Sequence, residues 1–313
     1  MEGKSFDSFY SSNLLPILEE LETLRSTVRK NVLMGFGLGL LLTVGVFLFI
    51  AVKAALIFPI LGAGIGFAIS YKVHKELKSR FKKDIIANMV RFIDETLSYD
   101  PNGKIDKKDY NKSKLFTQSV DSYKGDDYVQ GKLGATQIKF SELHTQYKTT
   151  DKDGKTQWHT IFKGIFFFAD FNKDFNGEIF IQPDIAEKMF GFMGSALQGI
   201  NKSKGDLVKM ENIEFEKEFV VYASDQVEAR YVLSTKLLQR ILDFKNKTGN
   251  KIYVSFIDSN VFIAISLNKN LFEVSYFKSL LNRGVIDSFN SYLELCVGIV
   301  GDLDLNTRIW TKK

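Results

Sequence analysis

Two long apolar runs near the start of the sequence follow one another almost without interruption. The first, "NVLMGFGLGLLLTVGVFLFIAV", covers residues 31–52, and the second, "AALIFPILGAGIGFAISY", covers residues 54–71. Lys53 is the only charged residue in or between them. Because an α-helix rises 1.5 Å per residue, about 20 apolar residues cross the ~30 Å hydrocarbon core of a bilayer. We therefore predict a transmembrane helical hairpin over residues 31–72 with Lys53 at its tip.

Glycines recur at a spacing of four in both runs, at Gly35 and Gly39 and again at Gly62 and Gly66. Small residues at this spacing let two helix backbones approach closely in lipid. These glycine faces can hold the two helices of one hairpin together, which we favour, or they can form a homo-oligomer. A cleaved signal peptide fits poorly, because the second run follows the first at once.

Basic residues flank the hairpin on both sides, whereas its tip offers Lys53 alone. They are Arg25, Arg29 and Lys30 before it, and Lys72, His74, Lys75, Lys78, Arg80, Lys82 and Lys83 after it. Because positive charge stays on the cytoplasmic side, we expect a multi-pass membrane protein with both termini in the cytoplasm. The same charges attract anionic lipid. We expect headgroup contacts from Lys72, Lys75, Lys78, Arg80, Lys82 and Lys83.

Apolar stripes with helical spacing lie on both sides of the hairpin. One consists of Leu14, Leu18, Leu21, Leu24 and Val28, and the other of Leu77, Phe81, Ile85, Met89, Ile93 and Leu97. Such spacing predicts an amphipathic helix within residues 1–30 and a basic amphipathic helix over residues 73–98. We favour pairing of the two helices as a stalk within one chain, with self-association between chains as the alternative.

Residues 99–313 are predicted to form a cytoplasmic α+β domain with a mostly antiparallel sheet, because short strand-like segments come in adjacent pairs. The expected strands are Tyr128–Lys132, Thr136–Tyr147, Thr160–Ala169, Glu178–Gln182, Glu218–Tyr222, Glu228–Leu233, Lys251–Ile257 and Val261–Leu267. Turns are expected at Asp153–Thr156 and Asp258–Asn260. Helices are expected at Pro183–Met193, at Ser234–Asn246 with Ser234 as N-cap, and at Val285–Val300.

The stretch "ADFNKDFNG" at residues 169–177 resembles the start of a calcium loop. An EF-hand loop counted from Asp170 needs Gly at its sixth position and Glu at its twelfth, where this chain has Phe175 and Ile181. We predict a turn between two strands and no metal. Phe171 and Phe175 are then expected to fold beneath the loop and cover the sheet. The alternative is an exposed tip that contacts a partner or a bilayer.

Three stretches of the domain resemble a known family. They are "SKLFTQSVDSYKGDDYVQGKLGATQIKFSELHTQYK", "IFKGIFFFADFNKDFNGEIFIQPD" and "FEKEFVVYASDQVEARYVLSTKLLQRIL". Together they are similar to a bacterial domain-of-unknown-function family of uncharacterised membrane proteins, over roughly residues 91–272. The resemblance implies a transmembrane hairpin ahead of the domain and a place in the bacterial inner membrane. It implies no activity, cofactor or catalytic residue.

Composition excludes several kinds of site. The net charge of +5 is too small to indicate nucleic-acid binding unless it is concentrated on one surface. One cysteine, Cys296, and three histidines make a zinc site unfavourable, and we expect no metal and no cofactor.

Two small groups of residues are candidates for chemistry. Glu142 and His144 stand two apart and share a strand face, as a general acid–base pair would require. Asp225, Glu228 and Arg230 form the second group, in which Glu228 and Arg230 are expected to pair on a strand. We favour a solvated strand face for the first group, and a structural ion pair over a ligand clamp for the second, so we assign no mechanism to them.

The leading hypothesis is a membrane-anchored interaction module that binds a partner protein or a lipid headgroup. The alternative is a membrane-tethered enzyme with a site near Glu142, His144 and Asp225. A transport or channel component is less favoured, because neither apolar run contains a charged residue and an ion path normally uses some.

Overall fold

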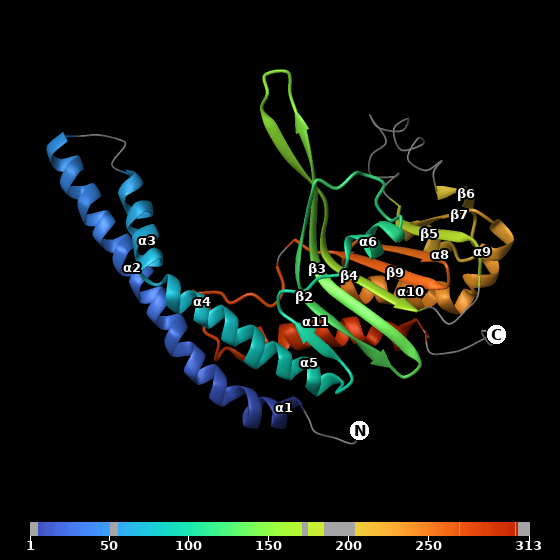
Figure 1. The fold of residues 1–313 in the computed structure, drawn as a ribbon, viewed down its shortest axis with the longest axis horizontal. Coiled ribbons are helices and arrows are strands. Elements are labelled where there is room, and N and C mark those ends of the chain that lie inside the picture. Colours follow the sequence, from blue (N-terminus) through green and yellow to red (C-terminus); the bar gives the residue numbers. More distant parts are fainter. Residues whose placement is uncertain are drawn as a thin grey trace. The chain divides into compact units, whose positions relative to one another are not determined.

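The computed structural model describes residues 6–50, 56–170, 175–184, 204–268, 270–303 and 305. The chain divides into two compact units (Figure 1). We call the first the helical unit; it combines residues 1–93 with residues 272–291. The second, the sheet unit, combines residues 94–271 with residues 292–313. The helical unit is therefore built from two stretches separated by most of the sheet domain.

One long helix, α2, dominates the helical unit. It runs without a break from Leu15 to Ile50, so the predicted N-terminal helix and the first apolar run form one element. The other elements are α1 (Phe6–Phe9), the π-helical turn η1 (Tyr10–Leu14), α3 (Phe58–Ile69), α4 (Tyr71–Arg80), the π-helical turn η3 (Phe81–Ile86) and α5 (Ala87–Ile93).

The two predicted apolar stripes meet inside the chain. Leu14, Leu18, Leu21 and Val28 from the N-terminal side are fully buried, as are Leu77, Phe81, Ile85 and Met89 from the other side. α2 contacts α4 and η3, which run beside it (Figure 1). The favoured intrachain stalk is therefore confirmed.

A single antiparallel sheet of nine strands forms the sheet unit, in the order β1-β2-β3-β4-β9-β8-β5-β7-β6. The α+β class with a mostly antiparallel sheet is thus confirmed. The strands are β1 (Ser98–Asp100), β2 (Ser122–Leu133), β3 (Thr136–Thr150), β4 (Thr156–Asp170), β5 (Glu178–Pro183), β6 (Asp206–Val208), β7 (Phe219–Ala223), β8 (Ile252–Ile257) and β9 (Asn260–Ser266).

Both predicted hairpin turns are present. Gly154 adopts a φ of 78° between β3 and β4, and Asp258 and Ser259 both have positive φ between β8 and β9, as a type I′ turn requires. β3 and β4 extend past their neighbours, because β2 pairs with β3 only up to Gln146 and β9 pairs with β4 only from Gly164. Their free ends form a two-stranded arm that projects from the sheet (Figure 1).

Helices α6 (Lys107–Lys112), α8 (Ile213–Glu218), α9 (Gln226–Val232), α10 (Thr235–Thr248) and α11 (Arg283–Asp302) complete the described structure. The predictions of α10 and α11 are confirmed. Ser234 caps α10 by accepting a hydrogen bond from Leu237 N, and Gly249 ends it in the left-handed region. The expected helix over Pro183–Met193 lies almost wholly outside the described residues, and Pro183 itself ends β5.

The predicted strand Glu228–Leu233 is wrong, because this segment belongs to helix α9. Asp225 accepts hydrogen bonds from Val227 N and Glu228 N at 2.7 and 2.9 Å, so it begins a helix there. The valines at both ends of "VEARYV" favoured a strand by propensity, and the cap outweighs that preference.

The "ADFNKDFNG" segment does join two strands, but these strands are not partners. β4 pairs with β3 and β9, whereas β5 pairs with β7 and β8. The segment is therefore a crossover and not a hairpin turn. Phe175 is buried, as predicted, and its ring lies edge-on to Phe256. Phe171 lies outside the described residues.

Candidate functional site

The glycine faces of α2 and α3 lie against each other. A Cβ atom placed on Gly35 would lie 2.8 Å from the carbonyl carbon of Gly62, and one on Gly62 would lie 2.9 Å from that of Gly35. A Cβ atom placed on Gly39 would lie 2.7 Å from the carbonyl carbon of Phe58, and one on Gly66 would lie 2.7 Å from that of Asn31. Any side chain at these positions would force the backbones apart. The favoured intrachain use of these glycines is therefore what the structure contains.

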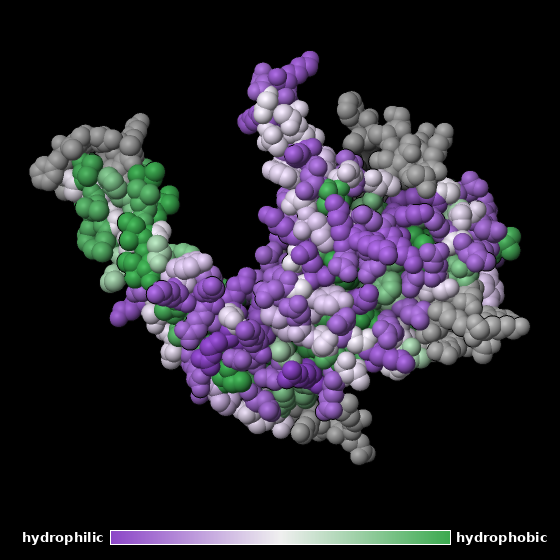
Figure 2. Space-filling view, viewed as in Figure 1, coloured by the Kyte–Doolittle hydropathy of each residue, from purple (hydrophilic) through white to green (hydrophobic). Residues whose placement is uncertain are grey.

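The opposite faces of the same helices carry a continuous apolar surface, which we call the apolar band (Figure 2). Its exposed side chains include Leu38, Leu41, Leu42, Val44, Ile60, Ile65 and Ile69. The described helix from Phe6 to Val46 is long and apolar enough to cross a membrane, whereas α3 is a shorter apolar helix. The structure thus supports one candidate membrane span by length and composition.

Polar side chains close the α2–α3 contact at the end nearest the stalk. Asn31 Nδ2 donates to Ser70 Oγ at 2.8 Å, and Ser70 Oγ donates to Gly66 O at 3.0 Å. Ser70 is buried between the helices. This Asn31–Ser70 bond marks the level at which the apolar band ends and the basic residues begin.

Only part of the predicted basic surface is exposed. Lys72, Lys75 and Lys83 are exposed. Lys78 Nζ lies 2.8 Å from a carboxylate oxygen of Glu273, Lys82 Nζ lies 3.7 Å from it, and Arg80 pairs with Glu20 at 2.7 Å. Nothing in the sequence pattern indicated Glu273 as a partner, because it stands almost 200 residues further along the chain.

The segment that carries Glu273 is anchored to the stalk by several polar contacts. We call residues 272–282 the strap. Buried Arg25 donates to Tyr276 O and pairs with Glu22 at 2.7 Å, while Glu22 also accepts from Leu280 N at 2.9 Å. Burial would raise the pKa of Glu22, but hydrogen bonds from Arg25, Leu280 N and Ser279 and the charge of Arg25 together lower it. The strap is therefore tied to α2 by a charged cluster.

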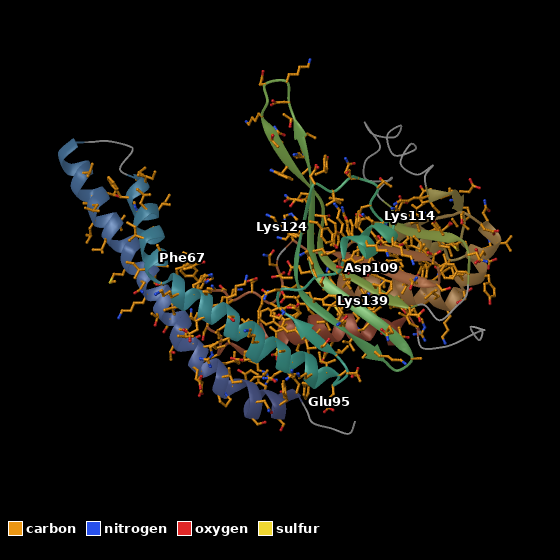
Figure 3. All side chains as sticks on the ribbon, in the orientation of Figure 1. Phe67, Glu95, Asp109, Lys114, Lys124 and Lys139 are labelled. Carbon is orange, nitrogen blue, oxygen red and sulfur yellow. The ribbon has the colours of Figure 1, made fainter. Side chains whose placement is uncertain are left out.

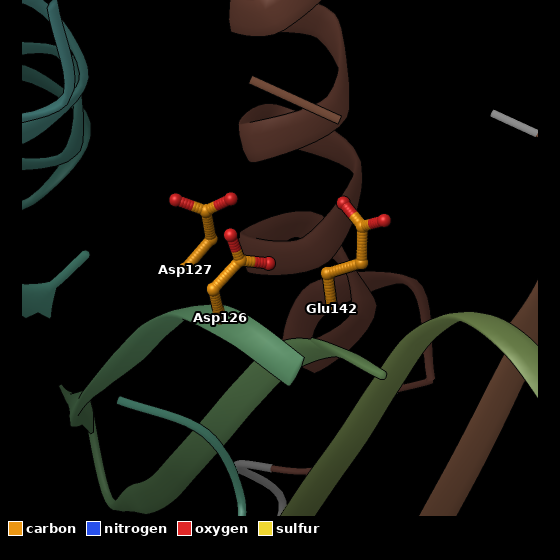
Figure 4. A group of neighbouring side chains, drawn as sticks. All are labelled: Asp126, Asp127 and Glu142. Carbon is orange, nitrogen blue, oxygen red and sulfur yellow. The ribbon is translucent and has the colours of Figure 1, made fainter. Parts of the chain in front are cut away.

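Three carboxylates of the sheet unit form an acidic cluster, Asp126, Asp127 and Glu142 (Figure 4). One oxygen from each lies within 4.8 Å of the others. The register between β2 and β3 shifts between Asp126 and Val129, and Asp127 has a φ of 58°. This bulge lets two adjacent aspartates approach one glutamate. Sequence reasoning identified Glu142 but not the aspartates, because a bulge has no clear sequence signal here.

Glu142 is the unusual member of this cluster. It is buried and accepts a hydrogen bond from Leu271 N at 2.7 Å. Burial raises the pKa of Glu142 to about 7, with a further upward contribution from Asp126 and Asp127, against the lowering effects of Leu271 N and Lys163. The group can hold a proton near neutral pH. Carboxylate oxygens in such a group also suit hard cations such as Ca²⁺ and Mg²⁺.

The structure does not bring Glu142, His144 and Asp225 together, as the alternative enzyme hypothesis requires. His144 shares β3 with Glu142, but its Nε2 lies 3.2 Å from Thr160 Oγ1. Burial lowers the pKa of His144, and the positive charges of Lys163 and Lys124 lower it further. Asp225 caps α9 directly after β7, and β7 lies five strand positions from β3. At ~4.8 Å per strand this separation is about 24 Å.

Glu228 and Arg230 do not form the expected strand pair, because both lie on α9, where residues two apart point in different directions. Glu228 accepts a hydrogen bond from Asn176 N at 2.8 Å and so holds the end of the β4–β5 crossover. Arg230 donates to Gln226 O within its own helix. Both residues have a structural role in these contacts.

Comparisons with known proteins support the family resemblance of the domain. Residues 160–305 match a family described as "Protein of unknown function (DUF3137)", which confirms the resemblance to a domain-of-unknown-function family. A comparison with proteins of curated function finds no match. Among solved structures, the chain is similar to the crystal structure of the mycobacterial trehalose monomycolate transport factor A, TtfA, at 9% identity over 72% of this chain and 95% of that chain. The TM-score is 0.35, which is too low to support an argument about fold or function.

Proposed function

We propose that this protein is a membrane-anchored interaction module. In this proposal α2 and the α3 segment cross the inner membrane as a two-helix hairpin, and the sheet unit binds a partner protein or lipid headgroups on the cytoplasmic side. The observation that carries the proposal is the apolar band on a glycine-packed helix pair. No acid–base site with Glu142, His144 and Asp225 is proposed, because these residues do not converge.

The energetics of the band favour lipid. Leu41, Ile60 and Ile69 are each about 70% exposed, at 69, 69 and 72%. Transfer of one such side chain from water to lipid is favourable by roughly 1.5–3 kcal/mol. The apolar band contains several such side chains, so their contributions add up. The glycine contacts on the inner faces add close backbone contact, which is what holds helices together in a bilayer.

The charges set the orientation of the hairpin. Arg29, Lys30, Lys72 and Lys75 lie just beyond the Asn31–Ser70 level, and Lys53 is the one charged residue in the connection at the other end. The positive-inside rule places the Asn31–Ser70 end at the cytoplasmic surface. The stalk and the sheet unit would then be cytoplasmic.

Cysteine labelling with a membrane-impermeant maleimide in intact cells tests this topology. Cys296 is buried, and burial raises the pKa of its thiol, so the wild-type chain supplies an unreactive background. We expect Lys53→Cys to react from outside the cell. We expect Lys152→Cys, at the tip of the arm, to react only after the inner membrane is permeabilised. Reaction of both variants on the same side of the membrane would contradict a hairpin that spans it.

The interaction part of the proposal needs a separate experiment. A photo-crosslinking amino acid at Trp158, which is 53% exposed on the arm, would report on partners in native membranes. The same amino acid at Asn246, exposed on α10, is the matched control. We expect one discrete adduct at position 158 that the control does not give. Identical patterns at both positions would count against a specific partner at the arm.

A further inference from the structure

We infer that the strap, residues 272–282, is a third membrane contact of this protein, in which Phe277 enters the interfacial layer of the bilayer that holds α2 and α3. This inference rests on the proposed membrane hairpin. It adds a lipid-binding element that lies about 200 residues after the hairpin in the sequence and that neither hydropathy nor charge patterning indicates.

The strap lies at the edge of the apolar band. The ring of Tyr276 is 6.1 Å from that of Phe67 and 5.6 Å from that of His74, measured between centroids. Phe67 is labelled on α3 near the start of α4 in Figure 3. It stands three residues before Ser70, so it lies about 4.5 Å inside the band at 1.5 Å per residue. Tyr276 therefore reaches the level at which the membrane-facing surface begins.

The strap is held in place on both sides of Phe277. Before it, Glu273 pairs with Lys78 at 2.8 Å, and the carbonyl of Tyr276 accepts from buried Arg25. After it, Leu280 N donates to Glu22 at 2.9 Å, and the Leu280 side chain is buried. A residue between two such anchors has a fixed position, so its exposure is a property of the fold.

Phe277 is exposed in this fixed position. Its side chain is 65% exposed, and its Cα lies about 3.8 Å from that of Tyr276, as consecutive residues must. Leu281, further along the strap, is 43% exposed. Apolar side chains exposed on an anchored segment beside the apolar band are unfavourable in water and favourable at a bilayer interface.

Charge identifies the bilayer as the surface that covers Phe277. Lys278 follows Phe277 directly and is exposed, and Lys72 and Lys75 are exposed on the adjoining α4. A lysine near an anionic membrane surface contributes about 1 kcal/mol of attraction. At a bilayer surface, apolar side chains enter the acyl boundary while lysines contact the headgroups. Phe277 beside exposed lysines, at the edge of the apolar band, fits this arrangement.

Spin labels on the full-length protein test the inference. Phe277→Cys, Leu41→Cys and Lys152→Cys are labelled separately, and the protein is placed in nanodiscs of phosphatidylcholine and phosphatidylglycerol. Collision with oxygen, which concentrates in lipid, is compared with collision with a water-soluble nickel chelate. Leu41→Cys reports on the hairpin and Lys152→Cys reports on an aqueous site. We expect Phe277→Cys to show at least a severalfold lower nickel-to-oxygen collision ratio than Lys152→Cys.

The outcomes separate the inference from the proposed function. Lipid-like ratios at both Leu41 and Phe277 support both ideas. A lipid-like ratio at Leu41 with an aqueous ratio at Phe277 overturns the strap contact and leaves the hairpin standing. An aqueous ratio at Leu41 overturns the proposed hairpin, and the inference falls with it. Phe277→Trp, with its fluorescence quenched by brominated lipid, gives a second reading if the cysteine variant folds poorly.

Discussion

At the scale of single residues, Glu142 is the group whose chemistry differs most from its ordinary state. Its carboxyl group is buried beside Asp126 and Asp127. Among the hydrogen bonds described above, it accepts one from a backbone N–H, that of Leu271. The folded protein therefore binds a proton at Glu142 more tightly than the unfolded chain does. Between pH 4.5 and about 7 this difference makes the stability of the sheet unit fall as the pH rises.

Glu142→Gln should remove that pH dependence. The shift from 4.5 to about 7, at ~1.4 kcal/mol per unit, corresponds to at most about 3.5 kcal/mol above neutral pH. The amide keeps an oxygen to accept from Leu271 N. We expect the variant to match the wild type at pH 5 and to have a higher Tm at pH 8, measured by circular dichroism on the full-length protein in detergent.

Glu142→Ala is the matched control for this experiment. It removes the charge but also leaves Leu271 N without its acceptor, so it should lower the Tm at pH 5, where the wild-type carboxyl is mainly protonated. A difference between Glu142→Gln and wild type that stays the same at both pH values would show that the buried carboxyl does not titrate in this range.

At the scale of elements, the α2–α3 contact makes the sharpest prediction. Gly35→Ala places a methyl group against the backbone of Gly62, which cannot move aside as a side chain can. Overpacking of this kind costs about 1–3 kcal/mol. We expect slower disulfide formation between cysteines at positions 31 and 70, whose side chains are in contact, in full-length protein treated with a mild oxidant.

Gly37→Ala provides the comparison on the same helix. A Cβ at Gly37 meets nothing within 4 Å, so this variant should form the 31–70 disulfide as fast as the unmodified helix does. Equal slowing by Gly35→Ala and Gly37→Ala would mean that helix propensity, and not backbone contact, explains the effect. Gly62→Ala and Gly64→Ala form an equivalent pair on α3.

Local signals predicted several elements well. α10 is bounded by Ser234 and Gly249, whose side-chain and backbone chemistry fix both ends. The apolar stripes of the stalk follow the helical period, and they are buried. Prediction failed where a distant contact or a cap decided the outcome. Asp225 turned a strand-like segment into α9, and the position of β5 between β7 and β8 is determined by pairing across the sheet.

At the scale of the whole molecule, the helical unit is assembled from both sides of the sheet domain. Phe289, in the first half of α11, lies against Phe81 and Phe272, with ring centroids 5.8 and 5.6 Å away. Phe289→Ala should therefore loosen η3 and the buried stripe of α2, although these residues stand more than 200 positions earlier. A loss of about 3 kcal/mol, typical of a buried phenylalanine, would speed amide exchange there about a hundredfold.

Hydrogen exchange on the full-length protein locates this effect. Peptides from α2 and η3 should lose protection, and peptides from β3 and β4 should keep theirs. Phe277→Ala removes an exposed ring from the same unit and should leave exchange in the stalk unchanged in detergent. Uniform loss of protection in both units would contradict their division into separate compact bodies.

The apolar helix pair of the candidate site was predictable, whereas the anchoring of the strap was not. Hydropathy and glycine spacing are local properties, and they indicated the helix pair directly. The strap depends on Arg25 meeting Tyr276 and on Glu273 meeting Lys78, and no periodicity relates residues so far apart. The acidic cluster depends on one extra residue in β2, which pattern reasoning does not detect.

The contact between Arg25 and Tyr276 also has a consequence for biosynthesis. About 250 residues separate the two, so a ribosome working at ~5–20 residues per second needs on the order of 10–50 seconds to travel from one to the other. During that interval the guanidinium lacks its carbonyl acceptor, and the nascent stalk remains unfinished. The part of the helical unit that precedes the sheet unit in the chain thus completes its contacts only after the sheet domain has been translated.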